Sequence, residues 1–320
     1  MVGAVDVGSN SIKLTVARPG LSGGIEELAS AVAAVRLGAG LSTSGRLADD
    51  RIEAALGALH NFAALAREHG ADRLVGVATE ATRRAANGAT FLERVRAETG
   101  WEVRAITGDE EADLTFRGVA LNGDMHGRVV IADIGGASTE LIVAEGGVVI
   151  MAQSVVVGSG TLTDTLVPSD PPTVAELAAS ARAAAARLDL IAVPTEAAVR
   201  LLCVGGTAEY LARLAGGGPV VDRAGIARAL DICRARASME LALTLAIPQA
   251  RARVLPAGIA VIRALADLLH CDQVEVAPSG IRTALLLDTF AEIAARNGAP
   301  AAARAAVRSA TPSPRMEGMT

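Results

Sequence analysis

An aspartate followed by a glycine-containing turn occurs twice in this chain of 320 residues, in residues 5–17 and again in residues 132–144. In each copy an apolar run leads to the Asp, the turn follows, and a second apolar run completes the pattern of a β-hairpin. The two copies match at these positions: Asp6 and Asp133, Gly8 and Gly135, Ser11 and Ser138, Leu14 and Leu141, Val16 and Val143, Ala17 and Ala144.

The two turns have the chemistry of a phosphate site. Gly allows backbone geometry that a Cβ opposes, and successive backbone N–H groups in such a turn can form a nest for an anion. A carboxylate leading into the turn can hold a hard cation such as Mg²⁺, directly or through water. Asp6 and Asp133 occupy that place. We therefore expect phosphate to bind at the turns and the adjoining lysine: Gly8, Ser9, Asn10, Ser11, Lys13, Gly135, Gly136, Ala137 and Ser138.

A third acidic stretch, residues 106–119, contains a predicted helix start. Thr107 and Glu110 have the spacing of a capping box, which gives Glu110 a structural role. Glu111 is one residue further on and points to another side of the helix. By its place alone, Glu111 is a first-turn carboxylate that the helix dipole favours.

These segments resemble the exopolyphosphatase and guanosine pentaphosphate phosphohydrolase (Ppx/GppA) family, within the actin, sugar kinase and Hsp70 superfamily. Residues 107–112 are similar to the family's Ser-Gly-x-x-Glu-Ala block, with Thr107 in place of the Ser. The resemblance implies that Glu111 is the catalytic carboxylate. It also implies phosphate contacts by Arg83 and Arg282, and a metal site with Asp133, Glu140 and Asp6.

The chain departs from the family pattern at two positions. Ala137 stands where the family usually has a third Gly, and Ala resists a positive φ. Thr161 stands where relatives often carry an Arg. Simpler roles also stay open: Arg83 on a solvated helix face, and Asp133 and Glu140 as a turn former or a strand-surface carboxylate.

Composition limits the class of protein. The net charge of −5 argues against a general nucleic-acid binder. The cysteines Cys203, Cys233 and Cys271 are too widely spaced for a disulfide framework or a zinc site, and indicate small core residues in a reducing cytosol. The N-terminus has no signal-peptide pattern and no spanning helix is expected, so we predict a cytoplasmic protein with no membrane partner.

The predicted fold is α/β, with duplicated actin-like (ribonuclease H-like) domains and an interdomain cleft. The first domain is expected at residues 1–121 and the second at 122–295. The last helix, residues 279–295, is expected to cross back to the first domain. Residues 296–320 lack periodicity and are expected to form a disordered tail.

Two further helix starts are predicted, the first from a local signal and the second from the resemblance to the family. Asp50 and Glu53 have capping-box spacing, which predicts a helix that runs to about Glu68. Residues 254–258, which contain Pro256, predict the start of another.

The expected reaction is hydrolysis of a terminal phosphoanhydride bond, with Glu111 activating water and Mg²⁺ (or Mn²⁺) as the cofactor. Exopolyphosphatase activity is the first choice, because Trp101 and Tyr210 are the only Trp and Tyr available to stack a guanine. A cationic track for polyphosphate would draw on Arg36, Arg83, Arg84, Arg117, Arg282 and Lys13.

Three other functions stay open. They are guanosine pentaphosphate 5′-phosphohydrolase, a non-catalytic regulator that binds polyphosphate or a nucleotide alarmone, and an actin-like ATPase or sugar kinase. The last would use the turn at Gly205 and Gly206 to carry adenosine. The sequence leaves a homodimer open.

Overall fold

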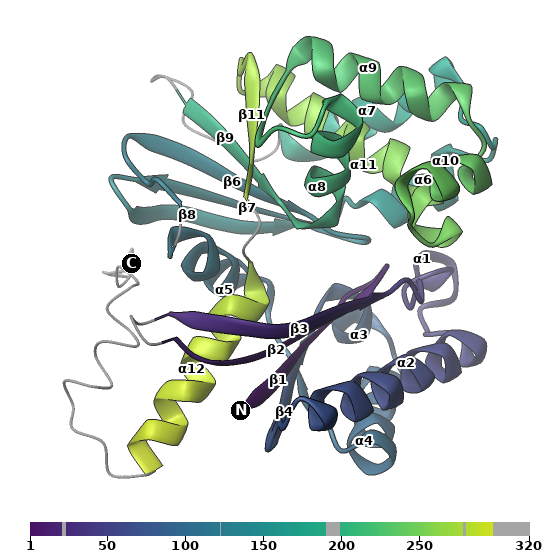
Figure 1. Cartoon of the computed structure of the whole chain (residues 1–320). Helices are drawn as coiled ribbons and strands as arrows, with labels where there is room; N and C mark the ends of the chain where they lie inside the picture. The colour runs from purple at the N-terminus through teal and green to yellow at the C-terminus, as the bar shows by residue number, and fades with distance from the viewer. Residues whose placement is uncertain (21–23, 122, 190–198, 278–279, 297–320) are drawn as a thin grey trace, which may run out of the picture.

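The computed structural model describes residues 1–20, 24–121, 123–189, 199–277 and 280–296 (Figure 1). Ser279, at the predicted start of the last helix, and residues 297–320 of the predicted tail lie outside the described residues. The first sheet contains β1 (Val2–Val7), β2 (Ile12–Pro19), β3 (Ile25–Ala33), β4 (Arg73–Ala78) and β5 (Glu102–Ala105). The second contains β6 (Arg128–Ile134), β7 (Thr139–Glu145), β8 (Val148–Val155), β9 (Val199–Val204), β10 (Val220–Asp222) and β11 (Gln273–Ala277).

The two sheets share one strand order. The first runs β3-β2-β1-β4-β5, and the second, read from its other edge, runs β8-β7-β6-β9-β11 with β10 added. In each sheet an antiparallel meander of three strands is extended by two parallel strands. The central strands β1 and β6 are buried over nearly their whole length, which fits strands covered on both faces.

Helices cover both sheets and join them. They are α1 (Leu41–Ser44), α2 (Asp49–Glu68), α3 (Glu80–Arg84), α4 (Gly88–Thr99), α5 (Gly108–Ala120), α6 (Ser159–Leu166), α7 (Val174–Leu188), α8 (Gly205–Ala215), α9 (Arg223–Ala235), α10 (Ser238–Leu245), α11 (Gln249–Leu268) and α12 (Ile281–Arg296). Among the described residues no single helix is long and apolar enough to cross a membrane, and α10 and α11 meet that criterion only as a pair bent by 99°.

The two halves exchange a helix. Although α5 follows the last strand of the first sheet, its apolar side chains Ala112 and Phe116 pack in a cluster with residues of the second sheet such as Ile131. Conversely, α12 follows the second sheet, but Leu286 and Phe290 pack with residues of β1 and β4. Figure 1 shows α12, in yellow, lying beside the strands of the first sheet. The exchange ties the two halves together at one side of their junction.

Helices α5 and α12 approach each other closely and also make polar contacts where they cross. A Cβ added at Gly118 of α5 would lie 2.2 Å from the carbonyl oxygen of Gly280, so only Gly fits there. Arg117 donates two hydrogen bonds of 2.8 Å to the carboxylate of Asp288 on α12. Arg117 therefore joins the two helices. The predicted domain boundary between residues 121 and 122 stays a prediction.

Two predicted helix starts are wrong. The helix expected from Asp50 begins at Asp49, and its N-cap is Ala48 with no side-chain cap. The helix expected to begin near Pro256 begins at Gln249, and Pro256 lies inside it. A proline removes one backbone hydrogen bond from a helix interior. Here α11 is buried along most of its length, so its packing in the second core overrides that local cost.

Candidate active site

The two Asp-Gly turns have the same hydrogen bond and the same cross-strand pairing. Gly8 N donates to Ser11 O at 3.1 Å, and Gly135 N donates to Ser138 O at 2.9 Å. At the base of the first turn Asp6 pairs with Lys13, and at the base of the second Asp133 pairs with Glu140. Each hairpin therefore presents an Asp at the same place. The residue paired with that Asp is a cation, Lys13, in the first hairpin and a second carboxylate, Glu140, in the second.

The turns are in contact with one another. Asn10 Nδ2 of the first turn donates to Ser159 Oγ at 2.9 Å, and Ser159 Oγ donates to the carbonyl oxygen of Gly135 at 3.0 Å. A Cβ added at Gly136 would lie 2.6 Å from Asn10 Cγ. Two segments more than 100 residues apart in the sequence thus line a common cleft.

The turns need Gly because other atoms lie too close for a Cβ. They do not need it for a positive φ, which the sequence had suggested. None of Gly8, Gly135 and Gly136 has a positive φ, and neither does Ala137. A Cβ at Gly135 would instead lie 2.9 Å from Ser138 O, inside the turn itself. Ala137 is buried with an ordinary φ, so the loop accepts Ala without strain.

The cleft between the turns is small, with a volume of about 50 Å³. Most of the predicted site residues line it: Asp6, Gly8, Ser9, Asn10, Ser11, Lys13, Glu111, Asp133, Gly135, Gly136, Ser138 and Glu140. Ala137 is not among its lining residues, and Arg83 and Arg282 lie beside it and are described below. Four carboxylates from three separate segments therefore line one small cleft.

Glu111 reaches the cleft because of the way α5 begins. Glu110 N donates to Thr107 Oγ1 at 3.1 Å and Thr107 N donates to Glu110 Oε2 at 2.9 Å, which confirms the predicted capping box. Glu110 is exposed and pairs with Arg104 at 2.9 Å. Glu111 is turned away from these contacts, and only 5% of the residue is exposed.

Arg83 lies directly beside Glu111. Its Nη1 is 3.4 Å from Glu111 Oε2 and donates to the carbonyl oxygen of Ile106 at 2.5 Å, and its Nη2 donates to Glu80. Arg83 therefore contacts the predicted catalytic carboxylate, and its role in phosphate binding stays a prediction. Its exposed neighbour Arg84 faces Glu80, with Nε 3.6 Å from Glu80 Oε1.

The pKa of Glu111 is raised to about 10, first by burial and then by the neighbouring carboxylates of Glu140, Asp6 and Asp133, while the Arg83 guanidinium lowers it. Burial likewise raises the pKa of Glu140 to about 7, and Asp133 is the next largest cause. In the protein without ligands, Glu111 therefore holds its proton at neutral pH.

The pKa values of Asp6 and Asp133 are also raised, mainly by burial, and the Lys13 ammonium lowers both. Perturbed carboxylates gathered in a cleft are typical of functional sites. Positive charge that enters this cleft would relieve the repulsion among them.

Comparison with known proteins identifies the family. A model described as the Ppx/GppA phosphatase family matches residues 16–292. The chain belongs to the Ppx/GppA phosphatase family. It is 33% identical to Exopolyphosphatase 2 of Mycobacterium tuberculosis over 290 residues, which cover 84% of this chain and 91% of that protein. It is 28% identical to the guanosine-5′-triphosphate,3′-diphosphate pyrophosphatase of Vibrio atlanticus, covering 90% of this chain and 59% of that protein.

A solved Ppx/GppA structure confirms the predicted fold class. The crystal structure of the Aquifex aeolicus family member matches with a TM-score of 0.71 and 29% identity, covering 91% of this chain and 98% of that one. The chain has the actin-like α/β fold of the Ppx/GppA family, with two mixed sheets.

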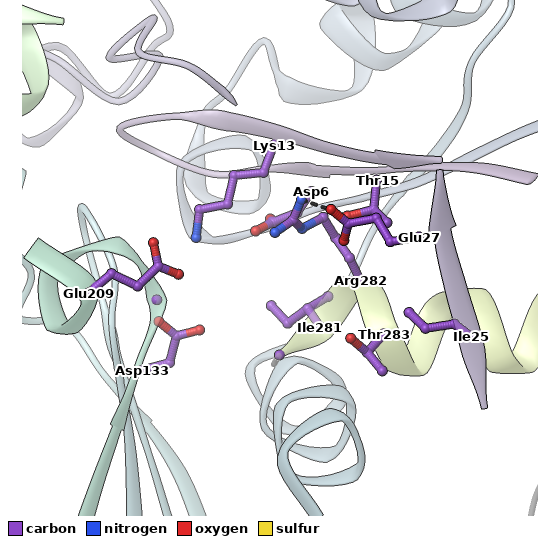
Figure 2. A pocket seen from close by; sticks show the side chains of 12 residues that line it. Asp6, Lys13, Thr15, Ile25, Glu27, Asp133, Glu209, Ile281, Arg282 and Thr283 are labelled. Atoms are coloured by element: carbon purple, nitrogen blue, oxygen red, sulfur yellow. Dashed lines mark hydrogen bonds between the residues drawn. The ribbon is translucent and has the colours of Figure 1, made fainter. Parts of the chain in front are cut away.

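A side pocket of about 260 Å³ opens next to the cleft between the turns, and both are lined by Asp6, Lys13 and Asp133 (Figure 2). Arg282 lies in this pocket, where its Nη1 donates to Leu14 O at 2.7 Å and to Thr15 Oγ1 at 2.8 Å. The remaining charged lining residues are Glu27 and Glu209. The pocket thus offers two cations and several carboxylates, and its lining contains no Trp, Tyr or Phe.

Arg251 is a cleft residue that the sequence analysis did not identify. It lies on α11 and lines the cleft, and a Cβ added at Gly206 would lie 2.1 Å from its Nη2. Its guanidinium stands 5.7 Å from the ring of Tyr210, and burial lowers its pKa. A guanidinium in this place suits phosphate oxygens. A single Arg within a long helix gave no sequence signal, because only the folded chain brings it to the second turn.

The cleft offers oxygen atoms to a hard divalent cation, but the described residues form no ready-made chelating set of three side chains. Asp6 Oδ1 is buried and has no hydrogen-bond partner in the described structure, which leaves an oxygen free to bind an ion or water. Mg²⁺ needs few protein ligands because it keeps several of its waters. Asp6, Asp133 and Glu140 are the oxygen donors available to such an ion.

The raised pKa of Glu140 predicts a pH-dependent stability of the metal-free protein. An unfolded Glu ionises near 4.5, whereas Glu140 in the folded protein ionises near 7. Between these pH values the folded protein keeps a proton that the unfolded chain has lost, so the free energy of unfolding falls as pH rises from about 4.5 to 7 and stays lowered above 7. Glu140→Gln removes this effect, and we expect it to stabilise the protein in EDTA at pH 8 by on the order of 3 kcal/mol.

Urea unfolding of wild type and Glu140→Gln at pH 4 and pH 8 measures this difference. The two proteins should be equally stable at pH 4, and Mg²⁺ should then stabilise the wild type more than the variant at pH 8. Glu68→Gln, at an exposed position near the end of α2, is the matched control and should change little at either pH. A variant less stable than wild type at pH 8 would contradict the prediction.

Proposed function

We propose that this Ppx/GppA protein is an exopolyphosphatase, which hydrolyses the terminal phosphoanhydride bond of inorganic polyphosphate and releases orthophosphate. The observation that carries the proposal is the junction of two turns with four carboxylates, two of them on buried residues, and a side pocket that has cations but no aromatic side chain. An M. tuberculosis relative at 33% identity is named as an exopolyphosphatase, which supports the assignment.

The backbone N–H groups of the two turns hold the terminal phosphates in this proposal, and Arg251 adds a cationic contact. Phosphoryl transfer requires positioning and charge neutralisation more than covalent catalysis. Bound Mg²⁺ or Mn²⁺, held by Asp6, Asp133 and Glu140, would supply positive charge that neutralises the phosphate oxygens. Lys13 and Arg282 extend the positive charge from the cleft into the side pocket.

Glu111 orients the attacking water and accepts its proton. The water oxygen bonds to the terminal phosphorus as the bridging P–O bond breaks, and the shortened chain leaves with that bridging oxygen. Glu111 must be ionised to act as the base, and burial opposes this in the empty cleft. Cationic charge in the cleft favours the ionised form, so Arg83 contributes by its place beside Glu111.

The arginines proposed for a polyphosphate track do not all face the cleft. Arg282 lines the side pocket and Arg83 lies at Glu111, but Arg117 joins α5 to α12 and Arg36 pairs with Asp164. The basic side chains that line the cleft and the side pocket are therefore Lys13, Arg251 and Arg282, a smaller set than the sequence predicted.

Guanosine pentaphosphate hydrolysis is the second candidate, and one observation favours it. Glu27 and Glu209 stand at the side pocket, where a carboxylate could accept hydrogen bonds from the N–H groups of a guanine edge (Figure 2). The Vibrio atlanticus relative is named for a guanosine substrate. The absence of aromatic side chains from the pocket lining leaves polyphosphate as the first choice.

A phosphate-release assay tests the proposed reaction. Orthophosphate should appear from polyphosphate in the presence of Mg²⁺, and EDTA should stop its release. ATP should be a poor substrate if the chain is neither an ATPase nor a kinase. Tight polyphosphate binding without phosphate release would instead establish a non-catalytic regulator and overturn the proposal.

Asp133→Asn should raise the Mg²⁺ concentration that gives half-maximal activity. Loss of one carboxylate ligand should cost roughly 10- to 100-fold in metal affinity, which is the range seen even for residues one step removed from a metal. A Mg²⁺ titration of activity measures the effect. Asp109→Asn is the control, because Asp109 is exposed in the first turn of α5 outside the cleft lining. Unchanged metal dependence in Asp133→Asn would remove this residue from the metal site.

A further inference from the structure

Arg36, in the segment between β3 and α1, has an unusual backbone and an incomplete set of contacts. Its φ is 50°, in the left-handed region that long side chains rarely adopt. Its Nη2 lies 2.5 Å from Asp164 Oδ1 of α6, while its buried Nε has no partner in the described structure. A strained residue with an unpaired buried donor suggests a functional demand on this position.

The Arg36 segment supports the first phosphate turn directly. The backbone N–H of Arg36 donates to Asn10 O at 2.9 Å, and that of Gly38 donates to Ser9 O at 2.9 Å. Ser9 and Asn10 both line the cleft. A displacement of Arg36 would therefore move the first turn.

The start of α6 supports the second phosphate turn in the same way. Ser159 N donates to Gly135 O at 2.9 Å, and Gly160 N donates to Gly136 O at 2.8 Å. Asp164 lies one helical turn further along α6. The ion pair between Arg36 and Asp164 thus connects the two segments that support the two turns.

This ion pair lies away from the exchanged helices. Figure 1 shows α5 and α12 at one side of the junction between the sheets, and α1 and α6 at the other. The Arg117–Asp288 contact holds the first side. Arg36 and Asp164, together with Asn10 and Ser159, provide the contacts near the turns.

We propose that Arg36 is a positioning residue, whose ion pair with Asp164 holds the two phosphate turns at the separation at which both can contact one phosphate chain. Its strained backbone is fixed by the two hydrogen bonds to the first turn, so the side chain is aimed at α6 before substrate binds. The kinetic consequence rests on the proposed function, and the geometric consequence does not.

A charge-reversal cycle tests the kinetic consequence. Arg36→Asp places two carboxylates opposite each other, Asp164→Arg places two guanidinium groups there, and the double variant restores the opposite charges. Asp tolerates the left-handed backbone, so Arg36→Asp adds no strain at that position. We expect kcat/KM for polyphosphate to fall by about tenfold in each single variant and to recover most of that loss in the double variant, the behaviour of directly coupled residues.

A distance measurement without substrate tests the geometric consequence. Spin labels at Thr43→Cys on α1 and Thr165→Cys on α6 span this side of the junction, and the native Cys203, Cys233 and Cys271 are buried. Pulsed electron paramagnetic resonance should show a longer or broader distance in each single reversal and the wild-type distance in the double variant. This result would stand even if polyphosphate proved not to be the substrate.

Two outcomes would overturn the proposal. One is an unchanged label distance in both single reversals. The other is single variants that melt at lower temperature but keep the wild-type kcat/KM when folded, because that result shows a structural role alone. Should a reversal fail to fold, Arg36→Gln and Asp164→Asn remove the charges with little change of shape, and they should shift distance and kcat/KM in the same direction by a smaller amount.

Discussion

Replacing Glu111 with Gln is expected to lower kcat for phosphate release by about 10²- to 10⁴-fold, the usual contribution of a general base. Gln keeps the size of the side chain and its place in the first turn of α5, but it cannot accept a proton from water. Substrate affinity should be largely retained, because the turns that hold phosphate are unchanged. Steady-state kinetics of orthophosphate release, with equilibrium binding of polyphosphate measured in parallel, separates the two effects.

Glu110→Gln is the matched control, since the two residues are adjacent on the same helix. Glu110 is exposed and completes the capping box with Thr107, a role that Gln also serves. Its loss should leave kcat near the wild-type value. An essential Glu110 beside a dispensable Glu111 would show that the catalytic role has been assigned to the wrong carboxylate.

Substituting Val for Gly135 should abolish substrate binding at the second turn. An added Cβ would lie 2.9 Å from Ser138 O, within the turn that is closed by the Gly135 N to Ser138 O hydrogen bond. The turn must therefore shift, and a displacement of about 1 Å in a site of this kind can cost 10²-fold in rate or more. Gly8→Val should act in the same way on the first turn, where the Cβ would lie 3.1 Å from Ser11 O.

Both substitutions are at turn tips, so the fold should survive, and circular dichroism with thermal melting checks this. Gly57→Val is the control, because a Cβ added at Gly57 of α2 meets nothing within 4 Å. It should leave activity unchanged. Activity of Gly135→Val within a few-fold of wild type, in a folded protein, would show that the second turn does not hold the phosphate.

The parts of the site that the sequence predicted depend on local patterns. The repeated Asp-Gly hairpins predicted two turns with a carboxylate at the base of each, and the structure has both. The capping box of Thr107 and Glu110 was also readable, because it depends on residues three apart. That local geometry turns Glu111 away from the cap, and the fold then places it in the cleft.

The remaining parts depend on contacts between distant segments. A Cβ at Gly136 would displace the side chain of Asn10 from the other turn, and no local pattern reveals that neighbour. Arg251 reaches the cleft from a helix that begins before Pro256, a residue that locally predicts a helix boundary. The packing of α5 on the second sheet is a tertiary exchange, because its apolar side chains meet residues that are distant in the sequence.

The most direct test of the proposed activity compares kcat/KM for polyphosphate, guanosine pentaphosphate and ATP, measured side by side with Mg²⁺. Polyphosphate should give the highest value, with an advantage that shrinks as salt is added, because salt screens contacts between the substrate chain and the partly exposed cations of the side pocket. The same measurement on Arg282→Gln should lower the value for polyphosphate. A higher kcat/KM for guanosine pentaphosphate than for any polyphosphate would contradict the exopolyphosphatase assignment and establish the guanosine substrate in its place.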